Sequence, residues 1–395
     1  MASKDGFRTI DSNLEEIDEK IRQHRLSIVK RVVIIIAVVM VLLVLFLLWM
    51  ESRSYTSYEI SSTADRSGSE TAQFDTFLGY IIEYSNDGIS CKDSDNVQIW
   101  NQSFEMNTPM LDICEGYLAV YDQGGLDLYI LSESGTECHI ETAKPIQTVC
   151  AASQGTVAVL MEESGVSYVK LYDRSGNELA NGQFYAEEDA YPVDIALSCD
   201  AKKLAVDMVD ISDGSVSTTI TFYNFDSVGQ NEIDNNVGTF SYENLFVPEV
   251  EYLSDSRMIA ISDSSVLVFD GSQKPSLSRE IALADEVRSV FYSSKYIGFV
   301  TENQEEEISY HIQVLDYKGS TVMENDTTMN YDWIGFLDND EVCIRSSQEC
   351  ELITIHSIKK FSYSFDQDLY YIASVDRYQN YVFIFEDTME EVRLK

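Results

Sequence analysis

The sequence predicts an all-β fold, an eight-bladed β-propeller with seven blades as the alternative, preceded by an N-terminal transmembrane helix. Near the start of the chain, residues 32–50 form a run of 19 residues without a charge. After residue 70, short runs rich in Val, Ile, Tyr and Phe alternate with turns of Gly, Asp, Asn and Ser, a pattern typical of β-strands. These runs recur with a period of about 40 to 50 residues, the length of one four-stranded propeller blade.

The apolar run 32–50 is long enough to cross a membrane as a helix. Val, Ile, Leu and Phe make up 15 of its 19 residues, and about 20 apolar residues span the hydrocarbon core of a bilayer. Five Lys and Arg residues precede it within 20–31, so the positive-inside rule places residues 1–31 in the cytoplasm and the rest outside. A cleaved signal peptide is the competing interpretation, but the run is too long and no small-x-small cleavage site follows.

The cytoplasmic head, residues 1–31, predicts a short amphipathic helix. Ser12 and Glu15 have the spacing of a capping box at a helix start. Apolar residues then recur at alternating spacings of three and four. This stripe fits equally a helix that dimerises or binds a partner and a helix that rests on the lipid surface, because two heptads are too few to be stable alone. The stripe consists of Leu14, Ile17, Ile21, His24 and Ile28.

The charge excess lies entirely after the apolar run. Residues 1–50 carry seven basic and six acidic residues, whereas the rest of the chain carries 20 and 61, a net charge of −41. Such a field repels nucleic acid and anionic lipid headgroups, so no nucleic-acid partner is expected. It could attract cationic partners or divalent ions, but a generally acidic extracellular surface is the simpler interpretation.

All seven cysteines follow the apolar run, and none forms a CxxC motif. Four of them lie within apolar runs, where a free thiol behaves as a small hydrophobic group. The sequence therefore predicts mostly unpaired core cysteines, with Cys343 and Cys350 as the only sequence-close pair that could bridge a hairpin. The cysteines are Cys91, Cys114, Cys138, Cys150, Cys199, Cys343 and Cys350.

The repeat is marked by an apolar strand that ends in a small polar turn. Successive markers are 39, 41, 51, 46, 46 and 40 residues apart. Within a unit, an apolar strand (109–114), a second apolar strand (116–122) and the marker strand (126–131) are followed by a more polar strand (136–142). The polar fourth strand suits an outer edge in water, and the apolar first strand suits the wall of a central channel. The markers are Asp93, Ser132, Asp173, Asn224, Asp270, Asp316 and His356.

An eighth blade is predicted at the end of the chain. The stretches 369–375, 381–386 and 391–395 supply three strands, and a ring left open there would expose two sheet edges. The segment 55–60 can supply the missing outer strand. We therefore expect residues 51–73 to hold a linker and a possible ring-closing strand, and residues 74–395 to form the propeller. Seven blades are expected if the first segment is only a linker.

Blade four departs from the pattern. Its strands lengthen between 204 and 253, and the Asn-rich segment 228–238 follows them. Long loops of propellers often carry binding residues, so this excursion is the predicted contact surface, although a tolerated surface loop is an equal alternative. The candidate binding residues are Asp210, Asp213, Gln230, Asn231, Glu232, Asp234, Asn235 and Asn236.

The stretch YPVDIALSCDAKKLAV, residues 191–206, resembles the S-P-D-G-K-x-L-A turn of bacterial WD-like and TolB-type propellers. With YNFDSVGQNE and VPEVEYLSD (247–255), it is similar to an uncharacterised bacterial family of membrane-anchored propellers, known only as a domain of unknown function. The resemblance covers nearly the whole chain and implies fold and topology, with no activity to carry over. Cys199 and Ala201 stand where the usual turn has Pro and Gly.

Catalytic and metal motifs are missing from the sequence. The four histidines are too scattered for a zinc site, and no GxSxG, GxxxxGK[ST] or GxGxxG occurs. The acidic clusters 93–96 and 338–341 lack the spacing of a calcium loop and are interpreted as solvated turns. We therefore expect no cofactor and no metal site.

Binding is favoured over catalysis because no reaction motif was found. The first hypothesis is a scaffold or sensor at the cell membrane that binds an envelope protein, a peptide or a cell-wall component. The alternative is an extracellular glycan hydrolase or lyase that uses carboxylates at the mouth of the propeller channel.

Overall fold

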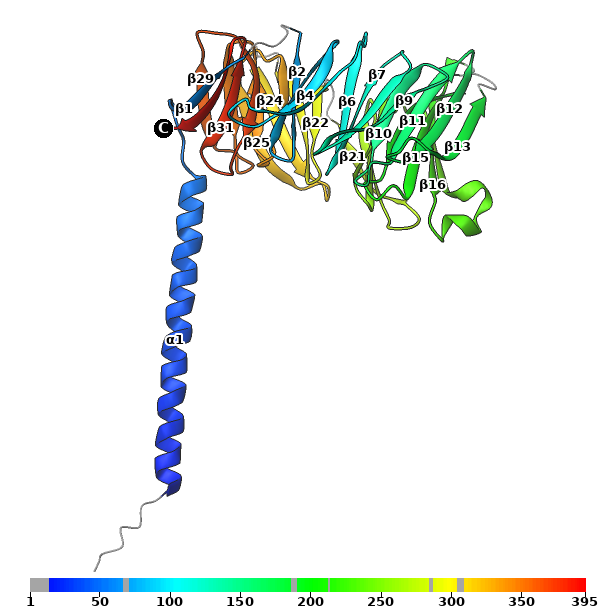
Figure 1. Cartoon of the computed structure of the whole chain (residues 1–395). Coiled ribbons are helices and arrows are strands. Elements are labelled where there is room, and N and C mark those ends of the chain that lie inside the picture. The colour runs from blue at the N-terminus through cyan, green and yellow to red at the C-terminus, as the bar shows by residue number, and fades with distance from the viewer. Residues whose placement is uncertain (1–13, 67–70, 186–189, 212–213, 284–286, 304–308) are drawn as a thin grey trace, which may run out of the picture. The chain divides into compact units, whose positions relative to one another are not determined.

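A computed structural model describes residues 14–66, 71–185, 190–211, 214–283, 287–303 and 309–395 of the chain. The chain divides into two compact units, 1–53 and 54–395. The first contains α1 (Leu14–Glu51; Figure 1), a helix of 38 residues. Within Glu19–Val44, a stretch of 18 residues is apolar enough to cross a membrane, with a mean hydropathy of 2.8 and no buried part.

The predicted stripe of the head lies on α1. The side chains of Ile21 and His24 are exposed. Leu14 and Ile17 belong to the same helix, but their side chains lie outside the described part of the structure, as does the whole of Ser12. Partner binding and lipid contact therefore both stay predictions for this stripe.

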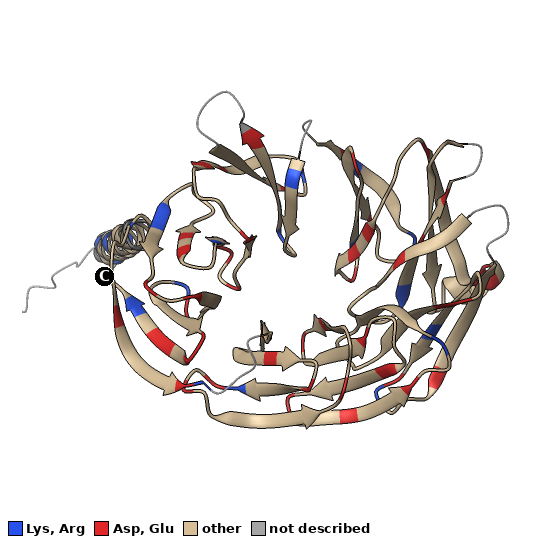
Figure 2. Cartoon of the chain, turned by 90° about the horizontal axis from the view of Figure 1, so that it is seen from above, with Lys and Arg blue, Asp and Glu red and all other residues tan. Residues whose placement is uncertain are grey.

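The second unit is a ring of eight four-stranded sheets, which confirms the predicted eight-bladed propeller (Figure 2). The first strand of each sheet contacts the first strand of at least one neighbouring blade. These first strands therefore surround the centre of the ring. Paired strands are antiparallel throughout. This arrangement leaves only short outer edges in water.

The first four blades follow one another along the chain. Blade 1 consists of β2 (Gln73–Phe77), β3 (Tyr80–Ser85), β4 (Gly88–Lys92) and β5 (Gln98–Ser103). Blade 2 consists of β6 (Pro109–Cys114), β7 (Tyr117–Asp122), β8 (Asp127–Ser132) and β9 (Gly135–Glu141). Blade 3 consists of β10 (Ile146–Ala151), β11 (Val157–Glu163), β12 (Val166–Tyr172) and β13 (Glu178–Tyr185). Blade 4 consists of β14 (Ala190–Leu197), β15 (Lys203–Asp210), β16 (Ser217–Asn224) and β17 (Asn236–Glu243).

The remaining four blades complete the ring. Blade 5 consists of β18 (Glu249–Ser254), β19 (Arg257–Ile261), β20 (Ser265–Asp270) and β21 (Ser276–Ala282). Blade 6 consists of β22 (Val287–Tyr292), β23 (Tyr296–Asn303), β24 (Ser309–Asp316) and β25 (Thr321–Thr327). Blade 7 consists of β26 (Trp333–Phe336), β27 (Val342–Arg345), β28 (Glu349–Ile353) and β29 (Lys359–Ser364). Blade 8 consists of β30 (Leu369–Ser374), β31 (Asn380–Phe385), β32 (Thr388–Leu394) and β1 (Tyr58–Asp65).

The ring closes by pairing the two ends of the second unit, because β1 is hydrogen-bonded to β32 as the outer strand of blade 8. The strand begins at Tyr58, three residues later than the segment 55–60 that the sequence indicated. Arg66 follows it directly and links blade 8 to blade 1. Its Nη2 lies 2.9 Å from Oε1 of Glu83, and its Nη1 donates to the carbonyl of Glu386 at 2.8 Å.

The core lies between the faces of adjacent blades. Between blades 1 and 2, for example, Phe77 and Ile82 pack against Leu118 and Val120, all of them buried. Second strands are buried on both faces, which explains why β7 is a nearly continuous apolar run. Each blade therefore depends on its neighbours for burial, and a single blade cannot form a core alone.

The cysteine prediction was partly wrong. Cys114, at the end of β6, forms a disulfide with Cys199, which lies 85 residues later in the turn after β14. Cys343 and Cys350 are both buried and free, so they do not bridge their hairpin. Register explains this, because Cys350 pairs with Arg345 and not with Cys343. The observed bond joins blades 2 and 4, a proximity that linear spacing could not indicate.

Candidate functional site

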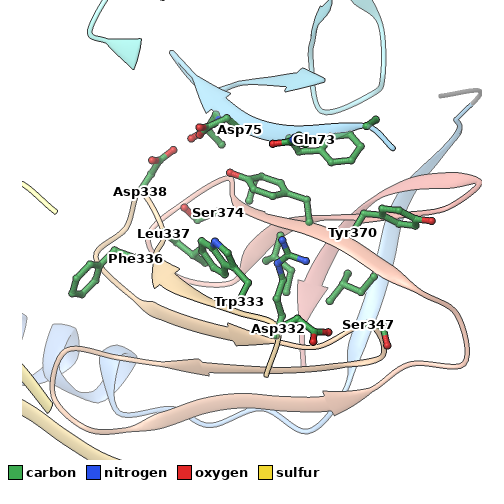
Figure 3. Close-up of a pocket in the computed structure, with 18 of the residues that line it drawn as sticks. Gln73, Asp75, Asp332, Trp333, Phe336, Leu337, Asp338, Ser347, Tyr370 and Ser374 are labelled. Carbon is green, nitrogen blue, oxygen red and sulfur yellow. The ribbon is translucent and has the colours of Figure 1, made fainter. Parts of the chain in front are cut away.

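A pocket of about 680 Å³ lies where the first strands of blades 7, 8 and 1 come together (Figure 3). These strands are β26, β30 and β2. The pocket combines aromatic walls with charged groups, which are the features of many ligand sites. Its aromatic lining consists of Phe74, Tyr84, Trp333, Phe336, Tyr370 and Tyr371, and its charged lining consists of Asp75, Asp332, Asp338, Arg345 and Asp368.

Trp333 is held over its own strand by a glycine. A Cβ atom added to Gly335 would lie only 2.5 Å from Cζ2 of Trp333, so the indole occupies the space that a side chain at 335 would need. Trp333 pairs with Arg345 across β26 and β27. The guanidinium carbon of Arg345 lies 5.3 Å from the centre of the indole ring. This cation–π contact fixes the guanidinium at the pocket wall.

Arg345 is a positive group of the pocket whose guanidinium lies within the field of Asp332 but is not bonded to its carboxylate. It is partly buried, and burial lowers its pKa from the usual value because the ionised form loses hydration. Within the described parts of the chain, it forms no ion pair with an Asp or Glu. A guanidinium offers five N–H donors in a planar fork that suits a carboxylate or phosphate. Arg345 is therefore suited to bind an anionic group in the pocket.

Two carboxylates lie in another part of the same pocket. Asp75, on β2, and Asp338, just after β26, point toward one another in Figure 3, away from Asp332. The carboxylate of Asp75 is reachable by solvent within the pocket but enclosed by protein on most sides. This loss of hydration raises its pKa to about 6, against the backbone N–H of Thr76, which donates to it at 2.7 Å. The negative charge of Asp338 raises the same pKa further.

A second group of carboxylates lies on the first strands of blades 2, 4 and 5 and consists of Asp112, Asp194 and Glu251. Asp112 accepts a hydrogen bond from the backbone N–H of Ala151 in blade 3 at 2.5 Å, and Asp194 accepts one from Val250 in blade 5 at 2.9 Å. Burial raises the pKa of Asp112 to about 6 and that of Asp194 to about 7. These two aspartates therefore join neighbouring blades through backbone contacts.

Asp207, on the second strand of blade 4, lies beside this group. It pairs with Asp194 across β14 and β15, and its side chain is fully buried. Neither of its carboxylate oxygens has a hydrogen-bond partner among the described residues. Burial, together with the charge of Asp194, raises its pKa to about 8, so it is largely protonated at neutral pH. No group of three His, Cys, Asp or Glu suited to a metal occurs in the described ranges.

The predicted contact residues of blade four do not gather at one place. Asp210 ends β15 and pairs with Ser217, whereas the loop 225–235 follows Asn224 at the other end of the blade. An eight-residue strand is roughly 25 Å long, so the loop cannot share a small ligand with Asp210. Asp213 lies outside the described residues.

The loop itself contains two short 3₁₀ helices, η2 (Gly229–Asn231) and η3 (Ile233–Asn235). Gln230, Asp234 and Asn235 line a groove of about 620 Å³ against β12 and β13 of blade 3. The other candidates make contacts within the propeller: Glu232 lies 2.5 Å from Nζ of Lys274, Asn231 donates to the carbonyl of Ser227 at 2.6 Å, and Asn236 donates to Thr239 at 3.1 Å.

The acidic cluster 338–341 also separates in space. Asp338 faces the pocket, and Asp340 pairs with Lys295 at 2.6 Å. Glu341 is buried and contacts Lys360. Glu341 is therefore not the solvated turn residue that the sequence indicated. The sequence did not reveal the pocket because its residues come from three blades; the only local signal is Arg345, a charge at the end of an apolar strand.

Comparisons with known proteins agree with this architecture. Residues 51–394 match a family described as "Family of unknown function (DUF5711)". No curated protein matches the chain. The structure is similar to that of BamB from Moraxella catarrhalis, with 12% identity and a TM-score of 0.50, over 86% of this chain and 100% of that one. It is also similar to the C-terminal WD40 domain of Sif2, with 10% identity and a TM-score of 0.50, over 87% and 98% of the two chains.

Proposed function

The chain belongs to the DUF5711 family of unknown function, and we propose that it is a membrane-anchored binding protein whose propeller lies outside the cell. Its partner is an envelope protein, a peptide or a cell-wall component. The observation that carries this proposal is the pocket between blades 7, 8 and 1, where aromatic walls and separated charges of both signs meet. Such a combination orients a ligand by its polar groups and retains it by its apolar surface.

The proposed topology rests on the charges beside α1. Five basic residues precede the apolar segment, and the excess of negative charge follows it, so residues 1–31 lie in the cytoplasm and the propeller outside. A reporter that is active only outside the cytoplasm, fused after Lys395, tests this. We expect an active reporter that remains with the membrane fraction. An inactive reporter would reject the topology, and release of the propeller into the medium would indicate a cleaved signal sequence.

Photo-crosslinking in intact cells tests the binding site. A photoreactive residue placed at Ser374, which lines the pocket, should capture a specific adduct on the full chain. The same residue at Glu141, exposed on the outer strand β9, serves as the control and should capture none. Trp333→Ala should reduce the yield from position 374, since it removes part of the pocket wall. Equal adducts from both positions, or none from the pocket, would contradict the proposal.

The glycan hydrolase remains the second candidate because the propeller does carry carboxylates with raised pKa values. A general acid for glycoside cleavage must stay protonated near neutral pH, and the pKa of Asp194, about 7, meets this need. Turnover of envelope polysaccharides by the full chain, abolished by Asp194→Asn and retained by Glu141→Gln, would support this candidate. Inactivity across such a panel would count against it.

A further inference from the structure

We infer that the pocket between blades 7, 8 and 1 binds a dipolar ligand, with its carboxylate on Arg345 and its ammonium group on Asp75 and Asp338. This inference rests on the proposed function, because it takes the same pocket as the binding site. It adds the chemistry of the ligand. A free amino acid, a short peptide or the C-terminal lysine of a protein can present both groups.

The anionic end of the ligand is assigned by Arg345. Its guanidinium lines the pocket, is held against Trp333 and forms no ion pair within the described parts of the chain. A partly buried guanidinium that has lost hydration gains most from a bidentate partner, and a carboxylate has that geometry. Asp332 contributes its backbone N–H to the carbonyl of Arg345 at 2.9 Å, which holds the end of β27 in place.

The cationic end is assigned by the two carboxylates. Asp75 and Asp338 point toward one another across the pocket, and neither pairs with a Lys or Arg among the described residues. Two close carboxylates repel each other, so a cation between them relieves that repulsion as well as forming its own contacts. An ammonium group fits because it offers three donors and no acceptor.

The charge of the whole chain favours a ligand that carries both signs. With an excess of 40 acidic residues, the protein repels a purely anionic ligand over distances up to the Debye length of about 8 Å in physiological salt. A purely cationic ligand would place positive charge beside Arg345. A dipolar ligand has no net charge and satisfies both ends. Its apolar part has Phe74 and Tyr371, whose rings are 6.1 Å apart, as a wall.

Four forms of one dipeptide test the assignment by calorimetry on the full chain in nanodiscs of phosphatidylglycerol at pH 7.5. The forms are alanyl-leucine, its N-acetyl derivative, its C-terminal amide and the doubly blocked compound. We expect saturable binding of the free dipeptide and at least a tenfold loss of affinity for each single block. Equal affinities for the free and the doubly blocked dipeptide would overturn the inference.

Two variants assign the ends of the ligand. In Arg345→Gln, the affinities for the acid and the amide should become equal, whereas the effect of N-acetylation should persist. In the double variant Asp75→Asn with Asp338→Asn, the effect of N-acetylation should vanish and that of amidation persist. Glu141→Gln, on the outer strand β9, is the matched control and should behave as the natural protein. The assignment is rejected if acetylation and amidation of the dipeptide lower its affinity for both pocket variants as much as for the natural protein.

The pH dependence and the source of the ligand complete the test. Because the pKa of Asp75 is about 6, the advantage of the free over the acetylated dipeptide should shrink between pH 7.5 and pH 5. N-acetyl-alanyl-lysine presents both charges as a protein C-terminus does, so tighter binding of it than of alanyl-leucine or free lysine identifies a protein end. Failure of every dipolar form, while crosslinking from Ser374 persists, rejects the inference and leaves the proposed function standing.

Discussion

The first strands of blades 1 and 2 carry an aspartate at the same place but use it differently. Asp75 and Asp112 each stand five residues before the tyrosine that begins the second strand. The carboxylate of Asp112 accepts a hydrogen bond from Ala151 in the next blade, whereas the carboxylate of Asp75 accepts one from its own neighbour Thr76. One carboxylate therefore connects blades, and the other is left to face a pocket.

The same contrast extends around the channel. On the side of blades 2, 4 and 5, carboxylates are partly or fully buried. Asp112 and Asp194 there accept hydrogen bonds from backbone N–H groups of the next blade. On the side of blades 7, 8 and 1, Arg345, Asp75 and Asp338 remain open to a ligand. Acidic residues on inner strands are thus structural on one side and available for binding on the other.

The largest expected effect is a fall in stability with rising pH, caused by the buried carboxylates. In the folded chain the pKa of Asp194 is about 7 and that of Asp207 about 8, against about 3.9 in an unfolded chain. The folded state therefore holds more protons than the unfolded state between pH 4 and pH 8, and the free energy of unfolding decreases as pH rises through this window. At about 1.4 kcal/mol per pKa unit, ionisation of the fully buried Asp207 alone lowers the free energy of unfolding by several kcal/mol across this window.

Thermal unfolding of the full chain at pH 5, 7 and 9 measures this effect. The midpoint should fall as pH rises, and Asp207→Asn should flatten the dependence because the amide does not ionise. Glu141→Gln should leave the dependence unchanged. A midpoint that rises between pH 5 and pH 9 would show that these carboxyls do not carry the shifts described.

A matched pair of substitutions measures the difference between the two aspartates. Asp112→Ala removes the partner of the Ala151 N–H and should destabilise the propeller by about 1–3 kcal/mol, the usual result of leaving a buried donor unpaired. Asp75→Ala removes no hydrogen bond between blades and also removes a carboxylate whose pKa is raised in the folded chain, so it should not destabilise the propeller at neutral pH. Chemical denaturation of the two variants decides the point, and equal losses would remove the distinction.

A comparable effect is expected from moving the pocket wall without deleting it. The added methyl of Gly335→Ala would meet the indole of Trp333, so the ring should move from its present position against Arg345. Such overpacking typically costs about 1–3 kcal/mol. Tryptophan fluorescence of the variant should change, and crosslinking from Ser374 should decrease. An unchanged spectrum and yield would show that the position of the indole is not needed.

The smallest effect concerns the loop of blade four. Glu232 and Lys274 form an exposed ion pair, so Glu232→Gln should change stability by no more than about 0.5 kcal/mol. Crosslinking from the pocket should not change either, because this loop lies in another blade. A reduced yield in this variant would bring the loop back as a contact surface.

Most of the fold could be predicted because turns are local. The markers Ser132, Asn224, Asp270 and Asp316 are the last residues of β8, β16, β20 and β24, since small polar residues favour the turn that ends a strand. The start of β1 was missed by three residues because its register depends on β32 at the other end of the chain. Non-local pairing leaves little signal in a short segment.

The pocket could not be predicted for the same physical reason. Asp75, Trp333, Arg345 and Tyr371 lie in three blades, and only closure of the ring brings them together. Loop length pointed instead to the segment 228–238, whose polar side chains are partly used in holding the loop. The disulfide between Cys114 and Cys199 could likewise not be predicted, because the two residues belong to blades 2 and 4 and are separated in the sequence by the whole of blade 3.

The most direct test of the account compares the two sides of the channel in one experiment. A photoreactive residue is placed at Ser374 in the pocket or at Glu251 on β18, on the acidic side, and adducts of the full chain are measured in intact cells. The account predicts a specific adduct from position 374 that is lost in Arg345→Gln, and none from position 251. An adduct from position 251 alone, or one from 374 that persists without Arg345, would contradict it.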